Sequence, residues 1–302
     1  MRIDDVIGQI REKKNPCIVG IDPEWSRLPA CYKQPEMSEA QAVELWAREV
    51  IDAVADVVPA VKPQAAFFEV FGAEGFAALE KTMRYAHQKG LFVVDDSKRG
   101  DIGNTARAYA QAHLAADGPL QADFLTVSPF LGVDTLQPFL QAAQQYDKGL
   151  FVLVRTSNPG AEELQSAEKE NGMTVTAWLA GQVDAMGAAL RGKHGYSAIG
   201  AVVGATYPVQ AAELRRRMPH SWFLVPGYGA QGGGAADVLP CFNADGLGAF
   251  VSASRSVLYA HESAAEFDGS RESYRRVVRA QARAMQREVY AALRAHCGRM
   301  CY

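Results

Sequence analysis

Eight short apolar runs, spread along almost the whole chain, constrain the fold more than any other sequence feature. Each run ends in polar or glycine-rich residues. None shows the polar alternation of a half-exposed strand, and this is typical of parallel strands covered on both faces. The predicted strands are CIVGID (17–22), PAVKP (59–63), LFVVDD (91–96), DFLTVS (123–128), LFVLVR (150–155), AIGAVVG (198–204), WFLVPG (222–227) and AFVSASR (249–255).

Helix-length segments lie between these runs and carry apolar residues at helical spacing. Segment 38–54 begins with Ser38 and Gln41, which fit a capping box, and segment 73–90 ends in a glycine suited to a helix C-terminus. Strands alternating with helices in this way predict an α/β fold, a (β/α)8 TIM barrel in which residues 1–302 form a single domain. The alternative is an open doubly wound sheet, but no GxGxxG motif follows the first strand.

Two segments are longer than the barrel repeat requires. Residues 159–197 form an insertion, with a polar part followed by an amphipathic helix. Residues 271–296 predict a long basic amphipathic helix, a type that can bind nucleic acid or a membrane surface. Its apolar spacing instead favours packing on the outside of the barrel, through Val277, Val278, Met285, Val289 and Leu293.

Composition argues against several classes of partner. The net charge of −3, from 31 basic and 34 acidic residues, gives no general attraction to nucleic acid or membranes. No apolar run reaches the roughly 18 residues of a membrane-spanning helix. The first ten residues contain two acidic residues and no apolar segment of the kind found in signal peptides, so we expect no signal peptide. The five cysteines are scattered without zinc-site spacing, Cys297 and Cys301 included, which favours free thiols. We therefore predict a cytoplasmic protein without nucleic-acid or membrane partners.

Charged residues end several of the predicted strands. In a barrel of this type the functional side chains gather at the carboxyl ends of the strands, where the loops meet. Acids and bases held together there would perturb one another strongly, as functional sites tend to require. The candidates that this rule selects are Asp22, Lys62, Asp96, Lys98, Asp101, Arg155 and Arg255.

The densest charge cluster lies in residues 93–110, VVDDSKRGDIGNTARAYA. Asp96 and Lys98 are two residues apart, so their side chains point the same way if the chain is extended. Asp101 follows three residues later, where the loop is expected to turn into a helix. On spacing alone, a salt-bridge network that closes the barrel mouth is the alternative to a catalytic array.

The last two strands end in phosphate-binding signals. VPGYGAQGGG (225–234) is rich in glycine, and ASRS (253–256) places an arginine after the eighth strand. Backbone N–H groups and arginine both bind phosphate oxygens, and these two loops form the usual phosphate site of such barrels. RTSNPGA (155–161) after the fifth strand suits hydrogen bonds to a polar heterocycle or sugar, with a capped loop as the alternative.

The string DSKRGDIGNT (96–105) contains D-x-K-x-x-D-I-x-x-T, the signature of the orotidine 5′-phosphate decarboxylase family. Five further motifs resemble those of the family and occur in the same order over nearly the whole chain: GIDP, VKPQ, SNPGA, PGYGAQGG and SRS. The chain most resembles the longer bacterial, type 2 branch. A sister family of sugar-phosphate decarboxylases shares D-x-K-x-x-D alone, so the ordered set of motifs is the more specific signal.

The resemblance implies the reaction and the site. Orotidine 5′-monophosphate would lose CO2 to give UMP in de novo pyrimidine synthesis, without metal or cofactor, in a homodimer. Lys98 would protonate C6, and Asp101 would reach the partner's site. The implied catalytic residues are Lys62, Asp96, Lys98 and Asp101. Asp22 and Lys62 would hold the ribose hydroxyls, with Asp101 and Thr105 contributing across the dimer interface. Ser157 would bind the pyrimidine, Pro226 is also implied to bind the substrate, and Gln231 and Arg255 would bind the phosphate. Asp95 and Arg99 are expected to be structural, and Ser128 stands where this branch is expected to have asparagine.

Three other functions predict different residues. The magnesium-dependent sister decarboxylases place an acid where Lys62 stands. A non-catalytic nucleotide-binding barrel would need the phosphate loops but not Lys98. A Schiff-base aldolase needs a neutral lysine, and neighbouring carboxylates would favour the charged amine. The residues at these positions therefore favour the decarboxylase.

Overall fold

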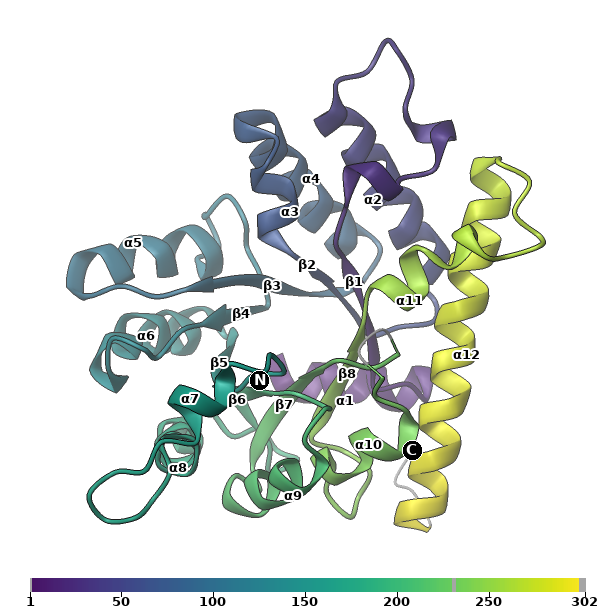
Figure 1. Ribbon diagram of the computed structural model, residues 1–302. Coiled ribbons are helices and arrows are strands. Elements are labelled where there is room, and N and C mark those ends of the chain that lie inside the picture. Colours follow the sequence, from purple (N-terminus) through teal and green to yellow (C-terminus); the bar gives the residue numbers. More distant parts are fainter. Residues whose placement is uncertain (1, 230–231, 299–302) are drawn as a thin grey trace.

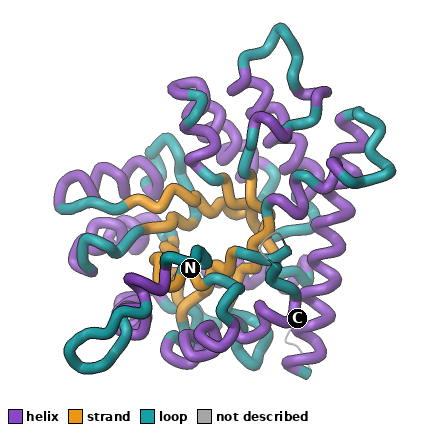
Figure 2. The backbone as a smooth tube through the Cα atoms, in the orientation of Figure 1, coloured by secondary structure: helices purple, strands orange, loops and turns teal. Residues whose placement is uncertain are grey.

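The computed structural model of the protein describes residues 2–229 and 232–298. Its centre is a closed barrel of parallel strands in which each strand pairs with the next and β8 pairs with β1 (Figures 1 and 2). All of the predicted strands are confirmed, and so is the (β/α)8 barrel. The strands are β1 (Cys17–Ile21), β2 (Ala60–Pro63), β3 (Phe92–Arg99), β4 (Phe124–Val127), β5 (Gly149–Arg155), β6 (Ser197–Val203), β7 (Ser221–Pro226) and β8 (Ala249–Ala253).

Helices surround the barrel (Figure 2). The predicted capping box of α2 is present, because the Ser38 hydroxyl accepts from the Gln41 N–H and the Gln41 side chain accepts from the Ser38 N–H. The helix bounds are α1 (Arg2–Lys13), α2 (Glu39–Val54), α3 (Ala65–Glu69), α4 (Gly72–Gln88), α5 (Gly103–Leu114), α6 (Gln137–Tyr146), α7 (Ala161–Gln165), α8 (Val175–Met186), α9 (Pro208–Arg217), α10 (Ala235–Val238), α11 (Arg255–Leu258) and α12 (Arg271–Cys297).

The helix α1 was not anticipated from the sequence. Its buried face, Ile3, Val6, Ile7 and Ile10, belongs to one apolar cluster with residues from the amino-terminal parts of the strands, such as Phe92, Phe124, Phe151 and Phe250. Phe124 and Phe151 stack with ring centroids 5.2 Å apart. This cluster fills the amino end of the barrel, so the carboxyl end is the end available for a ligand.

The helix α12 lies along the outside of the barrel beside α2, at the right of Figure 1. The five apolar residues predicted to form its packing face are all buried. The insertion contains α7 and α8, and α8 packs against β5 and β6 through Leu179, Ala180 and Val183. None of the helices in residues 2–229 and 232–298 is long and apolar enough to span a membrane.

Candidate active site

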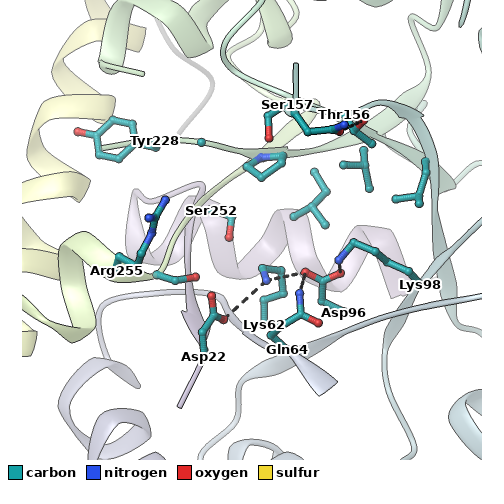
Figure 3. Close-up of a pocket in the computed structure, with 17 residues that line it drawn as sticks. Asp22, Lys62, Gln64, Asp96, Lys98, Thr156, Ser157, Tyr228, Ser252 and Arg255 are labelled. Atoms are coloured by element: carbon teal, nitrogen blue, oxygen red, sulfur yellow. Dashed lines mark hydrogen bonds and ion pairs between the residues drawn. The ribbon is translucent and has the colours of Figure 1, made fainter. Parts of the chain in front are cut away.

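A cavity of about 450 Å³ opens at the carboxyl end of the barrel (Figure 3). Residues from β1, β2, β3, β5, β6, β7 and β8, or from the loops that follow them, contribute side chains to it. Its lining residues are Asp22, Lys62, Gln64, Asp96, Lys98, Leu153, Thr156, Ser157, Asn158, Val202, Leu224, Pro226, Gly227, Tyr228, Ser252, Ser254 and Arg255.

The carboxylate of Asp96 is shared by two lysines. Lys62 Nζ lies 2.8 Å from Asp96 Oδ2, and Lys98 Nζ lies 2.5 Å from Asp96 Oδ1. Gln64 Nε2 donates to Oδ2 at 2.9 Å, and the hydroxyl of Thr126 donates to Oδ1 at 3.2 Å. Every oxygen of this carboxylate is therefore held by charged or polar donors, which fixes the two ammonium groups relative to each other.

Lys62 also faces a second carboxylate. It is 5% exposed, and its Nζ lies 4.0 Å from Asp22 Oδ1. The oxygen Asp22 Oδ1 is buried and has no hydrogen-bond partner among the described residues. In Figure 3 Lys62 lies between Asp22 and Asp96, so charges of alternating sign follow one another from β1 to β3.

The pKa values follow from this alternation. Burial favours the neutral form of a carboxyl, but the ammonium groups of Lys62 and Lys98 outweigh it and hold the pKa of Asp96 well below its usual range. Burial also opposes the charged form of Lys62, yet Asp96 and Asp22 together raise its pKa above the ordinary value. The buried pair therefore remains charged at neutral pH.

The end of β3 departs from a regular strand at Lys98. The pairing of β3 with β4 shifts register between Asp95 and Arg99, and Lys98 has a φ of 48°. A left-handed backbone is uncommon for a residue with a side chain and is found preferentially at functional sites. The Lys98 N–H donates to Thr126 Oγ1 at 2.9 Å, which helps to hold this conformation.

A buried network behind β3 supports the same segment. Asp95 is 0% exposed and accepts from Ser97 Oγ at 2.7 Å and from His113 Nδ1, on α5, at 2.6 Å. Arg99 Nε donates to the other ring nitrogen of His113 at 3.3 Å. With Arg99 as the donor to Nε2, the imidazole of His113 donates to Asp95 from Nδ1. Asp95 and Arg99 do not line the cavity, in agreement with the structural role expected for them.

Anion-binding groups lie at the opposite end of the cavity from Lys98 (Figure 3). Arg255 is the first residue of α11, and Pro226, Gly227 and Tyr228 follow β7. Gly227 has a φ of 106°, a conformation that favours glycine and leaves the backbone open to a ligand. Between the two ends, Thr156, Ser157 and Asn158 lie beside the apolar side chains of Leu153, Val202 and Leu224.

Comparisons with known proteins identify the family of the chain. Residues 16–268 match the orotidine 5′-phosphate decarboxylase / HUMPS family. The chain is 46% identical over 253 residues to an orotidine 5′-phosphate decarboxylase of Rhodopirellula baltica, an alignment that covers 81% of this chain and 83% of that protein. The chain belongs to the orotidine 5′-phosphate decarboxylase / HUMPS family.

Other relatives give the same result. An orotidine 5′-phosphate decarboxylase of Clostridium perfringens is 38% identical over 86% of this chain and 90% of its own length. The structure of Leishmania donovani OMP decarboxylase is 33% identical, with a TM-score of 0.74 over 95% of this chain and 98% of that chain. The resemblance to the family inferred from the sequence motifs is therefore confirmed over most of the chain.

Most of the residues that the family motifs single out converge on the cavity. Those that line it are Asp22, Lys62, Asp96, Lys98, Ser157, Pro226 and Arg255. Asp101 and Thr105 do not line it within this chain: the Asp101 carboxylate accepts from the Ile102 N–H at 2.8 Å, and Thr105 is exposed on α5. Gln231 lies outside the described residues. Ser128 does not line the cavity, and its N–H donates to the Arg99 carbonyl at 2.8 Å.

The expectation that Arg155 faces the barrel mouth is wrong. Leu153, two residues earlier on β5, lines the cavity, and regular alternation would point Arg155 the same way. The pairing of β5 with β6 shifts register between Leu153 and Arg155, and Arg155 lines a separate cavity next to α9. A one-residue irregularity therefore reverses the side chain, and no apolar pattern in the sequence indicates it.

Sequence reasoning missed Gln64, Tyr228 and Ser252, which also line the cavity. Gln64 follows Lys62 by two residues, so the alternation that places Lys62 could have identified it. Ser252 lies inside the apolar run of β8, where a lone hydroxyl gives little signal. Tyr228 stands among glycines and has its hydroxyl turned outward to Glu288, at 2.5 Å.

Proposed function

We propose that this chain decarboxylates orotidine 5′-monophosphate to UMP and CO2 in pyrimidine biosynthesis. The observation that carries the proposal is the Asp96 carboxylate held between Lys62 and Lys98 at one end of a cavity that has Arg255 at its other end. A nucleotide with a reacting base and a remote phosphate has matching chemistry at both ends. The family membership and the names of the relatives support the same reaction.

The proposed mechanism is electrostatic. Cleavage of the bond between C6 and the carboxylate releases CO2 and leaves the electron pair on C6, where no adjacent carbonyl delocalises it. The Lys98 ammonium would stabilise this charge and then transfer a proton to C6, and solvent would return a proton to Lys98. Asp96, through its contact with Lys98 Nζ, would hold the ammonium group in place, which explains why the signs alternate. Its charge next to the substrate carboxylate would also disfavour the bound ground state relative to the transition state.

The remaining residues would bind the substrate. Asp22, whose buried Oδ1 has no hydrogen-bond partner in the described residues, and Lys62 would hold the ribose hydroxyls. Ser157 would hydrogen-bond to the pyrimidine, and Pro226 would contact the substrate beside it. Arg255 and Gln231 would bind the phosphate, far from C6, so that this binding energy is available to stabilise the closed, reactive complex.

We also propose a homodimer in which Asp101 and Thr105 complete the site of the partner subunit. Large apolar side chains are exposed on the segments that follow β3 and β4: Ile102, next to Asp101 in the chain, is 63% exposed, and Phe130 and Leu131 are 73% and 54% exposed. Apolar groups gathered at the end of the barrel that carries the site suit a subunit interface. The 302 residues would form a single catalytic domain. Four cysteines in the described residues are free thiols, which fits a cytoplasmic enzyme.

A single assay tests the reaction. The absorbance of the orotate ring is followed with orotidine 5′-monophosphate as substrate, in the presence of excess chelator. We expect full turnover. No turnover with or without chelator would refute the assignment. Turnover that the chelator abolishes would instead indicate the metal-dependent branch of the family.

A further inference from the structure

Arg155 lies at the end of β5 with its side chain in a second cavity, of about 150 Å³. This cavity is separate from the active site and lies between the insertion that contains α7 and α8 and the helix α9, which lie together at the lower left of Figure 1. Gln165, Thr174 and Thr176 line it from the insertion, and Gln210 and Glu213 line it from α9. Its polar lining has no role in the proposed reaction.

The guanidinium of Arg155 is buried and only partly bonded. Arg155 is 1% exposed. Its Nη2 donates to Glu162 Oε1 at 2.7 Å, and its guanidinium carbon lies 4.3 Å from the ring centroid of Tyr207. Its Nε and Nη1 are buried and have no hydrogen-bond partner among the described residues. Buried donors of this kind are nearly always paired, so these two N–H groups indicate a missing acceptor.

The helix α8 adds a second attraction for an anion. Thr174 is its N-cap, and Thr174, Thr176 and Ala177 of its first turn line the cavity. The amino end of a helix carries a partial positive charge, which favours a negative ligand there. The positive end of α8 and the unpaired donors of Arg155 therefore border the same small space.

The cavity also offers acceptors, and these define the ligand further. Gln210 Oε1 is buried without a donor partner in the described part of the chain. Glu213 lines the cavity as well, although its carboxylate pairs with Arg217 at 2.9 Å. A ligand that satisfies both sides must present acceptor oxygens to Arg155 and a hydroxyl to Gln210 or Glu213.

We propose that this cavity binds a small oxyanion that carries a hydroxyl group, of which hydrogen phosphate is the simplest example. Its volume of about 150 Å³, against about 450 Å³ for the active-site cavity, suits such an ion and excludes a nucleotide. Sulfate, which has no proton at neutral pH, has nothing to donate to Gln210 or Glu213 and binds more weakly. The inference is independent of the proposed reaction.

Binding is measured by thermal unfolding and titration calorimetry at constant ionic strength, with inorganic phosphate and with sulfate. The protein carries Arg255→Ala, which weakens anion binding in the active site. We expect phosphate to raise the Tm more than sulfate does. Adding Arg155→Met lowers the phosphate affinity at least tenfold. Arg216→Met, at an exposed position on the helix α9 that borders the cavity, leaves it unchanged. Equal responses to the two anions, or binding that is indifferent to Arg155, would refute the proposal.

Circular dichroism shows whether the Arg155→Met protein folds. Two further measurements do not depend on that variant. Gln210→Leu removes the acceptor at a half-buried position and is expected to reduce the preference for phosphate over sulfate. Crystals of the unmodified protein soaked in arsenate, a protonated phosphate analogue, should show an anomalous peak within about 3 Å of Arg155 Nε or Nη1. A peak only beside Arg255 would overturn the proposal. A peak at Arg155 without any increase in Tm in solution would also overturn it, because it would show an adventitious ion only.

Discussion

Lys98 Nζ lies 2.5 Å from Oδ1 of Asp96, the residue two positions earlier on the same strand. The Lys98 backbone at this point is in the left-handed region, with a φ of 48°. The second oxygen of the same carboxylate is held by Lys62 at 2.8 Å. Asp96 is thus a fixed anion between two cations, and its geometry determines where the Lys98 ammonium can act.

The first prediction concerns this ammonium. In the proposed mechanism Lys98→Ala removes both the charge next to C6 and its proton donor, and we expect kcat to fall by at least about a thousandfold. The side chain of Lys98 is 45% exposed, so the variant should fold normally, which circular dichroism can verify. Lys81→Ala, at an exposed position on α4, is the control and should have the native rate. A near-native rate for Lys98→Ala would exclude the proton-donor role.

Asp96→Asn tests the electrostatics of the array through stability. It leaves the buried Lys62 without its closest anion, and we expect a loss of about 3–5 kcal/mol in the free energy of unfolding at pH 7. The pKa of Asp96 is lowered in the folded state, so its stabilising effect is complete above the unfolded value of about 3.9 and is lost as the pH falls toward the folded value.

The comparison is made by denaturant unfolding of native and Asp96→Asn proteins between neutral pH and pH 3. The difference in free energy of unfolding between the two should be constant above about pH 5 and should shrink below about pH 4. A difference that grows on acidification would contradict a lowered pKa for Asp96.

The proposed sharing of the site between two subunits gives a prediction about mixed dimers. Asp101 and Thr105 do not line the cavity of their own chain, so Lys98→Ala and Asp101→Ala should be defects of different subunits at each site. When the two inactive proteins are mixed, dissociated and reassembled, half of the dimers are mixed, and each of these has one native site of two. Activity should recover to about a quarter of the native value. No recovery, with mixed dimers demonstrated by mass spectrometry, would contradict this geometry.

The buried network behind β3 predicts a separate effect on stability. His113→Leu leaves the carboxylate of Asp95, which is 0% exposed, with the hydroxyl of Ser97 as its one side-chain partner among the residues that the structure describes. We expect a loss of about 3–5 kcal/mol, because a buried charge loses its main donor. His113→Asn can still donate to Asp95 and should lose less. Equal losses for the two variants, measured by denaturant unfolding, would show that packing matters here and the hydrogen bond does not.

The sequence predicted the strands and most of the site because both depend on simple patterns. Apolar runs without alternation identify buried parallel strands, and a charge at the end of such a run is expected at the barrel mouth. Arg155 fits the same pattern, yet a register shift in β5 turns it away, and only tertiary pairing determines that shift. Asp101 fits the pattern as well, yet its carboxylate accepts from the Ile102 N–H and does not line the cavity of its own chain, which is why we propose that it acts in a partner subunit.

The last prediction concerns the phosphate end of the site. Arg255→Ala removes a charged donor, and we expect kcat/KM for orotidine 5′-monophosphate to fall by about 10- to 100-fold, since hydrogen bonds to charged groups contribute about 1.5–3 kcal/mol. Orotidine, which lacks the phosphate, provides the matched control: native and Arg255→Ala proteins should process it at the same low rate. Guanidinium ion added to the variant should restore part of the loss for the phosphorylated substrate only. An equal loss on both substrates would place the effect of Arg255 at the reacting base and contradict its assignment to the phosphate.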